Sequence, residues 1–380
     1  MTGKWKGLFS LGVAVSMALC GCGRTAPATA PQANTEYVLQ ATEAIETEET
    51  EEAVDKHPFD FTVCFGGDIS LADDAVTTAR MEASENGIFD CISPELVDVM
   101  QSADIMCLNN EFTYSTNGSP MEGKAYTFRA DPARVAVLDQ LGVDLVNLAN
   151  NHVYDYGKQA LLDTFSTLEE DGLPYFGAGR TLEEAMQPCY MEVDGKIIAF
   201  VAASRAEKNK MTPQATEDSP GILRCYDTTL FVEEIREADA NADFVIAYVH
   251  WGTEYSDVLE PVQEETAREY IDAGADAIIG AHPHCLQGID YYNGAPIFYS
   301  LGNYWFNSKT LDTMLVQLHI YGDDEGYVIE PTIVPAIQTG STTSYLTDPE
   351  DRLELYQYLM ELSPNASIDE NGLVHPSPTL

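Results

Sequence analysis

The feature that most constrains this chain is a series of short apolar segments, each followed closely by a carboxylate, amide or imidazole side chain. Between these segments lie stretches whose apolar residues recur at helical spacing, for example 88–100 and 133–141. Strands that alternate with helices predict an α/β or layered α/β/β/α domain. Binding sites in such folds assemble outside the carboxyl ends of the strands. The sequence therefore predicts one site built from several strand ends.

The polar residues at these strand ends are of the types that bind metal ions. They are Asp68, Glu111, Asn151 with His152, His250, and His282 with His284, after the segments 61–65, 105–108, 143–148, 244–249 and 275–279. Each residue alone can be a turn former or a helix cap. Imidazoles and carboxylates together suit divalent metals such as Mn, Zn, Fe or Co. Because Pro283 fixes the backbone between two histidines, both rings can be aimed at one place.

Later segments predict antiparallel strands. Asp194-Gly195 and Asn293-Gly294 each separate two strand-like segments and are typical of two-residue hairpin turns. The segments 314–320 and 327–334 predict a further pair. We expect residues 336–380 to hold a last helix, near 350–362, followed by a polar, proline-containing tail that frays.

The first 22 residues predict an export signal. Two lysines precede an apolar stretch, 8–19, that is too short to span a bilayer. The stretch ends in Leu19-Cys20-Gly21-Cys22. This pattern resembles a bacterial lipobox, in which Cys22 would be lipidated and become the new N-terminus. An ordinary signal peptide or an N-terminal helix is the alternative. With the lipobox, we expect an extracytoplasmic protein anchored by lipid to the outer face of the cytoplasmic membrane.

The segment 23–57 predicts an acidic, disordered linker. It has no Lys or Arg between residues 25 and 55, and its acidic residues crowd into 46–52. Such a composition buries too little apolar surface to offset the entropy lost on ordering.

The formal net charge of −43 argues against nucleic acid as a partner, because phosphate backbones are bound by clustered Lys and Arg. An anionic substrate would need local cations, which bound metal ions would supply. Arg129 and Arg205 are candidates for binding a carboxylate or phosphate, since basic residues are scarce. The alternative for each is a structural ion pair.

Several motifs together identify a family. They are Gly67-Asp68-Ile69-Ser70-Leu71, Asn109-Asn110-Glu111, Asn147-Leu148-Ala149-Asn150-Asn151-His152, Asp155-Tyr156-Gly157, His250-Trp251-Gly252-Thr253-Glu254-Tyr255, Gly280-Ala281-His282-Pro283-His284 and Ser300-Leu301-Gly302-Asn303. In these motifs and in their order along the chain, the sequence resembles the poly-γ-glutamate capsule synthesis proteins of the CapA type, a branch of the calcineurin-like metallophosphoesterases. The resemblance covers about 59–307.

The resemblance implies a four-layer α/β/β/α sandwich of the metallophosphoesterase type over residues 58–335, with two divalent metal ions. It implies that Asp68 and His284 bind the first metal and that Glu111 bridges the two. The implied ligands of the second metal are Asn151, His250 and His282. The position of His152 matches the histidine that would protonate a leaving oxygen or steady the transition state.

Further residues of the motifs are candidates for substrate binding. Tyr255 and Asn303 are two of them. Glu254 is a third, or it orients His250 by accepting a hydrogen bond from its ring.

Two positions depart from the phosphoesterase pattern. Ser70 stands where that pattern has a histidine, and Glu111 stands where it has an aspartate. Because a serine hydroxyl is a poor ligand at neutral pH, the first site is expected to be weak, completed by water or empty. Both departures weigh against phosphoester hydrolysis more than against metal binding.

Two functions fit these observations. The first is an exported lipoprotein that takes part in poly-γ-glutamate synthesis or export through a dinuclear, hydrolytic metal site. The second is a non-catalytic component that binds the polymer or the membrane subunits of a synthesis complex and keeps a relic metal site. The presence of His152 favours the catalytic function, because that residue is not needed to hold metal. The absence of histidine at position 70 favours the non-catalytic component with a relic metal site.

Overall fold

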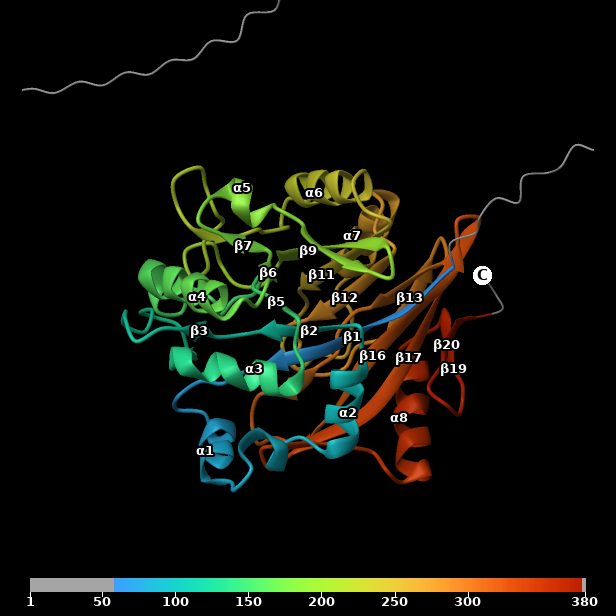
Figure 1. Ribbon diagram of the computed structural model, residues 1–380, viewed down its shortest axis with the longest axis horizontal. Helices are drawn as coiled ribbons and strands as arrows, with labels where there is room; N and C mark the ends of the chain where they lie inside the picture. The colour runs from blue at the N-terminus through green and yellow to red at the C-terminus, as the bar shows by residue number, and fades with distance from the viewer. Residues whose placement is uncertain (1–57, 378–380) are drawn as a thin grey trace, which may run out of the picture. The chain divides into compact units, whose positions relative to one another are not determined.

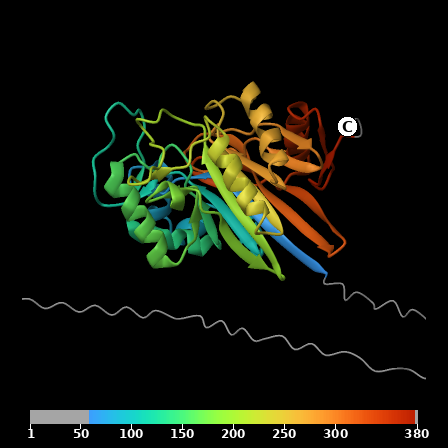
Figure 2. The same cartoon turned by 90° about the horizontal axis from the view of Figure 1, so that it is seen from above.

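The computed structural model of the protein describes residues 58–377. The predicted lipidation site Cys22 and the predicted linker 23–57 lie outside these residues. Two large sheets pack against each other, with helices on both outer faces (Figures 1 and 2). The predicted four-layer α/β/β/α architecture is confirmed.

The first sheet has the order β18-β17-β16-β1-β2-β5-β6, with β15 also paired to β1. Its parallel strands are β1 (Phe59–Ile69), β2 (Ile105–Asn110), β5 (Leu145–Asn147), β6 (Tyr175–Phe176) and β15 (Asn303–Trp305). Its antiparallel strands are β16 (Leu311–Asp323), β17 (Gly326–Thr339) and β18 (Thr342–Tyr345).

The second sheet has the order β13-β14-β12-β11-β9-β8. Its strands are β8 (Cys189–Val193), β9 (Lys196–Ser204), β11 (Phe244–His250), β12 (Ala277–Ala281), β13 (Ile289–Tyr292) and β14 (Ala295–Phe298). The four middle strands run parallel, and each outer strand joins its neighbour as a hairpin. Both predicted turns are confirmed, because Asp194-Gly195 and Asn293-Gly294 have the positive φ angles of a type I′ turn.

Helices cover the outer face of each sheet. The first sheet is covered by α1 (Val76–Ala83), α2 (Pro94–Ser102), α3 (Ala136–Leu141) and α4 (Gly157–Asp171), and the second by α6 (Thr229–Asp239) and α7 (Pro261–Asp272). The expected helix 88–100 is instead a 3-10 turn (Gly87–Asp90) followed by α2. Pro94 explains the break, since proline starts a helix readily but does not continue one.

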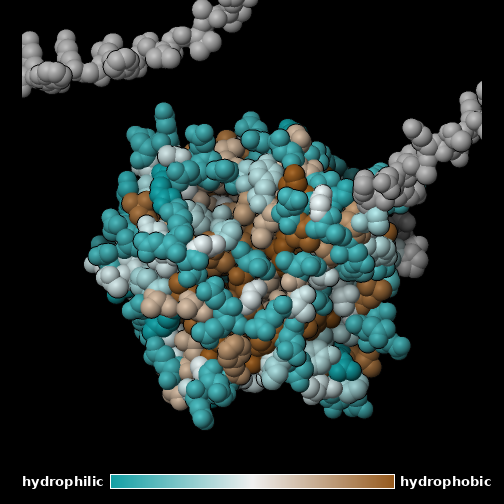
Figure 3. All heavy atoms as spheres, in the orientation of Figure 1, coloured by the Kyte–Doolittle hydropathy of each residue, from teal (hydrophilic) through white to brown (hydrophobic). Residues whose placement is uncertain are grey.

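The side chains of each central strand alternate between two hydrophobic cores, one between the two sheets and one beneath the helices that cover its own sheet. Phe65 of β1 meets Phe200 and Tyr248 between the sheets, with ring centroids 6.3 and 6.5 Å away. Its neighbour Cys64 faces the core beneath the helices. Because successive side chains of a strand point to opposite faces, a strand buried on both faces is apolar throughout. Hydrophilic residues cover most of the outer surface visible in Figure 3.

The expectation that the C-terminal tail frays is wrong for residues 366–376. After α8 (Pro349–Glu361), β19 (Ala366–Ile368) and β20 (Val374–Pro376) form an antiparallel hairpin. Ile368 and Val374 are buried in the core between the sheets. The Tyr291 hydroxyl also donates to the Val374 carbonyl at 3.0 Å. Burial of apolar side chains and this hydrogen bond hold the tail in place.

Within residues 58–377, no helix has the length and apolar character needed to cross a membrane.

We expect a chain that ends at residue 362 to be less stable than the parent by about 3–5 kcal/mol, because it loses two buried aliphatic side chains. Denaturant unfolding followed by circular dichroism measures this difference. A chain that ends at residue 377 is the control and should unfold like the parent. Equal stability of the two truncated chains would contradict the observed packing.

Candidate metal centre

The predicted ligand residues come together at one edge of the two sheets. Asp68 lies near the end of β1, Glu111 directly follows β2, and His250 ends β11. His282 follows β12 immediately, and Asn151 lies in the loop after β5. Every one of these side chains is buried. Adjacent parallel strands end side by side, which is why residues far apart in sequence meet here.

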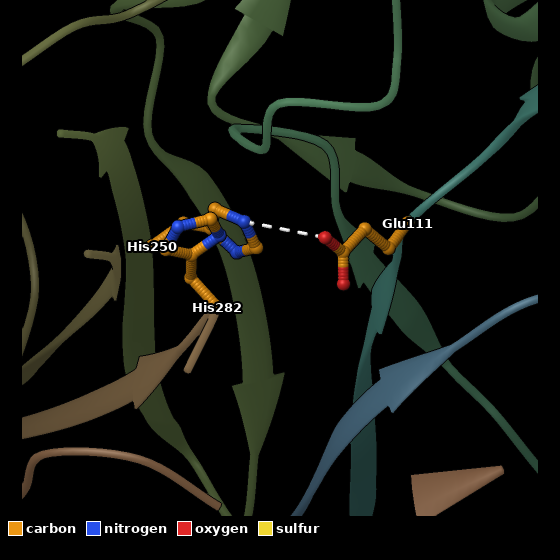
Figure 4. Close-up of side chains that lie close together, drawn as sticks. All are labelled: Glu111, His250 and His282. Carbon is orange, nitrogen blue, oxygen red and sulfur yellow. Dashed lines mark ion pairs between the residues drawn. The ribbon is translucent and has the colours of Figure 1, made fainter. Parts of the chain in front are cut away.

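The Glu111 carboxylate occupies the middle of the cluster. Its Oε1 atom lies 3.4 Å from His250 Nε2 and 3.9 Å from the Nε2 atoms of both His284 and His152. Within residues 58–377, neither of its oxygens has a hydrogen-bond partner. Figure 4 shows the imidazoles of His250 and His282 beside each other, across from this carboxylate. A buried carboxylate without a donor is costly unless a cation neutralises it, so a metal ion fits this position.

Two groups of three residues can each hold a metal ion. One is Glu111, His250 and His282, and the other is Asp68, Glu111 and His284; within each group the candidate ligand atoms lie within 4.8 Å of one another. Glu111 is common to both, as expected for a bridge. Asn151 Oδ1 extends the first group, since it lies 2.7 Å from His250 Nε2.

The two histidines of the loop after β12 have an unusual backbone. His282 has a φ of 98° and His284 a φ of 56°, a region that residues other than glycine rarely occupy. Such conformations cost on the order of 1–3 kcal/mol each and gather at functional sites. The ring centroids of His282 and His284 lie 6.1 Å apart, on either side of Pro283, and one ring belongs to each of the two candidate groups.

The side of the cluster around Asp68 contains more amide groups than imidazoles. Asp68 Oδ2 lies 3.0 Å from His284 Nδ1, and Asp68 Oδ1 accepts a hydrogen bond from Asn109 at 2.7 Å. Asn303 Oδ1 lies 2.8 Å from the same His284 nitrogen. The Ser70 hydroxyl is buried and has no hydrogen-bond partner in the part of the chain that the structure describes. In the described part of the chain, no further His, Cys, Asp or Glu completes this group in place of a histidine at position 70.

Burial and neighbouring charges set the protonation of the cluster. Burial, reinforced by the charge of Asp68, raises the pKa of Glu111 well above its ordinary value. Burial also raises the pKa of Asp68, but its hydrogen bonds to His284 and Asn109 and the charge of His284 bring it below its ordinary value. For His250 and His282, burial and then the neighbouring imidazoles lower the pKa well below the ordinary value. Both rings are therefore neutral near pH 7, the form that binds metal.

His152 is held by a chain of charged contacts. Its Nδ1 lies 2.7 Å from Asp155 Oδ2, which also accepts a hydrogen bond from the Phe128 backbone at 2.7 Å. The other oxygen of Asp155 lies 2.6 Å from the Lys124 ammonium. Burial lowers the pKa of His152, and Asp155 opposes this only in part. With Nδ1 fixed by Asp155, Nε2 of this ring is left for a second contact near Glu111.

Lys124 is a residue of the site that the sequence did not reveal. Its side chain is only 5% exposed, and its ammonium also donates to the backbone carbonyl of Asn151. The one available signal was the scarcity of basic residues in so acidic a chain.

A cleft of about 280 Å³ opens over the cluster. His152 and His284 lie at its base, against the rings of Phe128 and Phe306 at centroid distances of 4.4 and 4.7 Å. Its rim includes Val76, Tyr126, Glu254, Tyr255 and Lys309. The Lys309 ammonium lies 3.4 Å from the centroid of the Tyr255 ring. The cleft therefore combines aromatic walls with one cation.

The predicted substrate-binding residues separate into two groups. Tyr255 and Glu254 line the cleft, and Asn303 contacts His284 within the cluster. The alternative in which Glu254 accepts a hydrogen bond from His250 is wrong. Glu254 is exposed, and the Nδ1 atom of His250 faces the Asn109 amide at 3.3 Å instead.

Neither predicted arginine lines the cleft. Arg129 donates to the Asn117 carbonyl at 3.1 Å, and its guanidinium lies 4.3 Å from the Tyr156 ring centroid. Arg205 donates to the Tyr226 carbonyl at 3.4 Å and lies 4.7 Å from the centroid of that ring. Neither forms an ion pair among the described residues. Their role in substrate binding stays a prediction.

We expect Glu111→Gln to stabilise the metal-free protein near neutral pH. The folded state holds a proton on Glu111 at pH values where the unfolded chain has released it, so the parent loses stability as pH rises above the ordinary value of 4.5. The variant has no carboxyl group at this position, so its stability does not fall in this way as pH rises. The difference in stability between variant and parent should vanish below pH 4.5. Thermal unfolding across pH, after metal removal, measures the difference.

With metal bound, the order of stability should reverse, because the ion neutralises the carboxylate that the variant lacks. A metal-free parent as stable as the variant at every pH would contradict the assignment of Glu111 as an unpaired buried acid.

The residues of this cluster all lie in the part of the chain that matches a known protein family. Residues 62–308 match the family model described as "Bacterial capsule synthesis protein PGA_cap". The chain is 33% identical over 268 residues to the PGA biosynthesis protein CapA of Bacillus subtilis, a match that covers 69% of this chain and 68% of that protein. It is 36% identical over 231 residues to the capsule biosynthesis protein CapA of Bacillus anthracis, covering 59% of this chain and 55% of the relative.

Solved structures of similar proteins are more distant. A putative 5'-nucleotidase from Staphylococcus aureus is 14% identical with a TM-score of 0.46, covering 79% of this chain and 58% of its own. A hypothetical protein from Thermus thermophilus is 19% identical with a TM-score of 0.43, and the match covers 72% of this chain and 99% of that protein. The family model, by contrast, covers well over half of the chain. The chain therefore belongs to the PGA_cap family of bacterial capsule synthesis proteins.

Proposed function

We propose that this protein takes part in the synthesis or export of a poly-γ-glutamate capsule and that it acts on the polymer as a metal-dependent hydrolase. Membership of the PGA_cap family and the names of the Bacillus relatives support the polymer. The observation that carries the chemistry is the unpaired Glu111 carboxylate, buried among the imidazoles of two candidate metal groups.

Two divalent ions, Mn, Zn, Fe or Co, suit this mixture of carboxylate, amide and imidazole ligands. Asp68, Glu111 and His284 would hold one, and Glu111, Asn151, His250 and His282 the other. Ions in such a site supply a Lewis acid and a nucleophile at neutral pH.

His152 is the residue that we assign to proton transfer. Cleavage of a γ-glutamyl amide leaves an amine, which must receive a proton as the bond breaks. Asp155 fixes Nδ1 of the ring, so Nε2 is the atom that would take a proton from the attacking water and pass it to this amine. Phe128 and Phe306 cover the two imidazoles at the base of the cleft and keep bulk water away from them.

The cleft suits a substrate with both apolar and anionic parts. A polyglutamate chain offers a methylene-rich backbone and one free carboxylate per residue. Tyr255 and the aromatic walls can contact the methylenes, while Lys309 at the rim can pair with a carboxylate.

We also propose that the protein works outside the cytoplasm, tethered by lipid at Cys22 to the outer face of the membrane. The segment 23–57 would then give the domain reach from the membrane towards polymer that emerges from membrane-bound synthesis subunits. The lipobox-like Leu19-Cys20-Gly21-Cys22 and the acidic composition of the segment support this placement.

One observation favours the non-catalytic alternative. Among the described residues, the metal group at Asp68 has no imidazole other than His284, and Ser70 stands where the phosphoesterase pattern has a histidine. A first site that held metal weakly would leave a component that binds polymer without cleaving it.

The substitution His152→Ala separates the two functions. We expect metal content to stay unchanged, because His152 belongs to neither candidate metal group, and turnover of γ-linked glutamate polymer to fall roughly 10²–10⁴-fold. Elemental mass spectrometry and chromatography of the products measure the two quantities.

His319→Ala is the matched control, because this histidine is 40% exposed and pairs with Asp60 on the surface. It should match the parent in both measurements. Undiminished turnover in His152→Ala would exclude the catalytic role of that residue, and a parent that binds polymer without turnover would favour the non-catalytic component.

A further inference from the structure

A second group of cations lies beside the metal centre, on the segment that follows β9. Arg205, Lys208, Lys210 and Arg224 fall within twenty residues of a chain that has 19 basic and 62 acidic side chains. Among the described residues none of the four forms an ion pair. Arg134, Arg180, Lys196 and Lys124, in contrast, all pair with carboxylates. In so acidic a protein, a basic cluster without acidic partners is available to an external anion.

Two of these cations, Lys208 and Arg224, line a cavity of about 780 Å³. Lys208, Gln214, Arg224 and Tyr226 contribute to its lining. Glu207 and Asp227 line it as well, but each of these carboxylates accepts a hydrogen bond from a nearby backbone N–H instead of pairing with a cation.

The two arginines are fixed against one aromatic ring. The guanidinium of Arg205 lies 4.7 Å and that of Arg224 5.1 Å from the centroid of the Tyr226 ring. Arg224 also donates to the carbonyls of Thr212 and Glu207, each at 2.6 Å. Two like charges held this close to one ring repel each other, and an anion that contacts both relieves that repulsion.

A buried donor without a partner completes the cavity. Gln214 accepts a hydrogen bond from the Arg224 backbone at its Oε1 atom, at 2.8 Å, which leaves its Nε2 for another acceptor. That nitrogen is buried and makes no hydrogen bond among the described residues. A carboxylate oxygen is an acceptor of the kind that this amide and the two guanidinium groups would bind together.

The same segment is hydrogen-bonded to the metal centre. The Arg205 backbone donates to the His250 carbonyl at 2.8 Å, and the Thr212 hydroxyl donates to the Asn151 carbonyl at 2.7 Å. Two successive hydrogen bonds, through Thr212, therefore connect the Arg224 guanidinium with a candidate metal ligand.

We propose that this cavity is a carboxylate-binding subsite that holds one part of an anionic chain while a neighbouring part of the same chain occupies the metal cleft. The inference rests on the proposed function, because it names where a polycarboxylate substrate is held. Arg205, which the sequence marked as a candidate for binding a carboxylate, lies against Tyr226 of this cavity and does not line the cleft.

The test is calorimetric titration of the purified protein with a short synthetic γ-linked glutamate oligomer. We expect the double variant Lys208→Ala/Lys210→Ala to bind it roughly fivefold more weakly, since each exposed ion pair contributes modestly. Arg205→Gln should weaken binding as well. The γ-linked isoglutamine oligomer, in which each free α-carboxylate is replaced by an uncharged amide, should not bind at this cavity.

The matched control is Arg236→Ala/Arg268→Ala, which removes the same charge from exposed positions on α6 and α7. It should bind within about twofold of the parent, because charges far from the ligand are screened. Equal melting temperatures would show that both double variants fold. The inference is overturned if the two double variants bind the oligomer equally or if the parent does not bind it. It is also overturned if inorganic phosphate competes with the bound oligomer as effectively as unlabelled glutamate oligomer does.

Glu111→Gln separates this inference from the proposed function. If that variant cleaves polymer as fast as the parent, the hydrolytic centre is wrong. The subsite stands in that case as long as the lysine variant still binds more weakly.

Discussion

Glu111 places a carboxylate in a fully buried position where no N–H or O–H group of the described residues donates to it. Such a group destabilises a metal-free protein, and the fold surrounds it with imidazoles that burial keeps neutral. Neutral imidazoles cannot compensate its charge, whereas divalent cations can. The remaining features of the site follow from this arrangement: the amides that fix the rings, the strained loop around Pro283 and the separate anchoring of His152 by Asp155.

The sandwich holds these groups in place through close contact between strands. At Gly67 a Cβ atom would lie 1.9 Å from the Gly302 carbonyl oxygen, so only glycine allows this approach. The same approach brings Asn303 of β15 into register with Asp68 of β1. Aromatic side chains between the sheets, such as Phe65 and Tyr248, fix the two sheets relative to each other and therefore the two halves of the metal centre.

The sequence predicted the layered fold and the strand-end residues because both leave local signals. Apolar segments such as 244–249 and 275–279 identify strands, and a residue directly after a strand must lie at the sheet edge. Lys124 could not be predicted, because it comes from an irregular loop and reaches Asp155 only through tertiary contact. The C-terminal hairpin was missed because its strands have three residues each, too few for a periodic pattern. The second basic group was not predicted, because its two arginines, Arg205 and Arg224, meet only around Tyr226.

Metal content tests the central claim most directly. Elemental mass spectrometry of the protein purified with added Mn or Zn should find close to two equivalents, and the double variant His282→Ala/His284→Ala should lose them. About one equivalent would mean that the group around Asp68 is incomplete without a histidine at position 70. A parent protein with no bound metal would contradict the assignment of these strand ends as a metal centre.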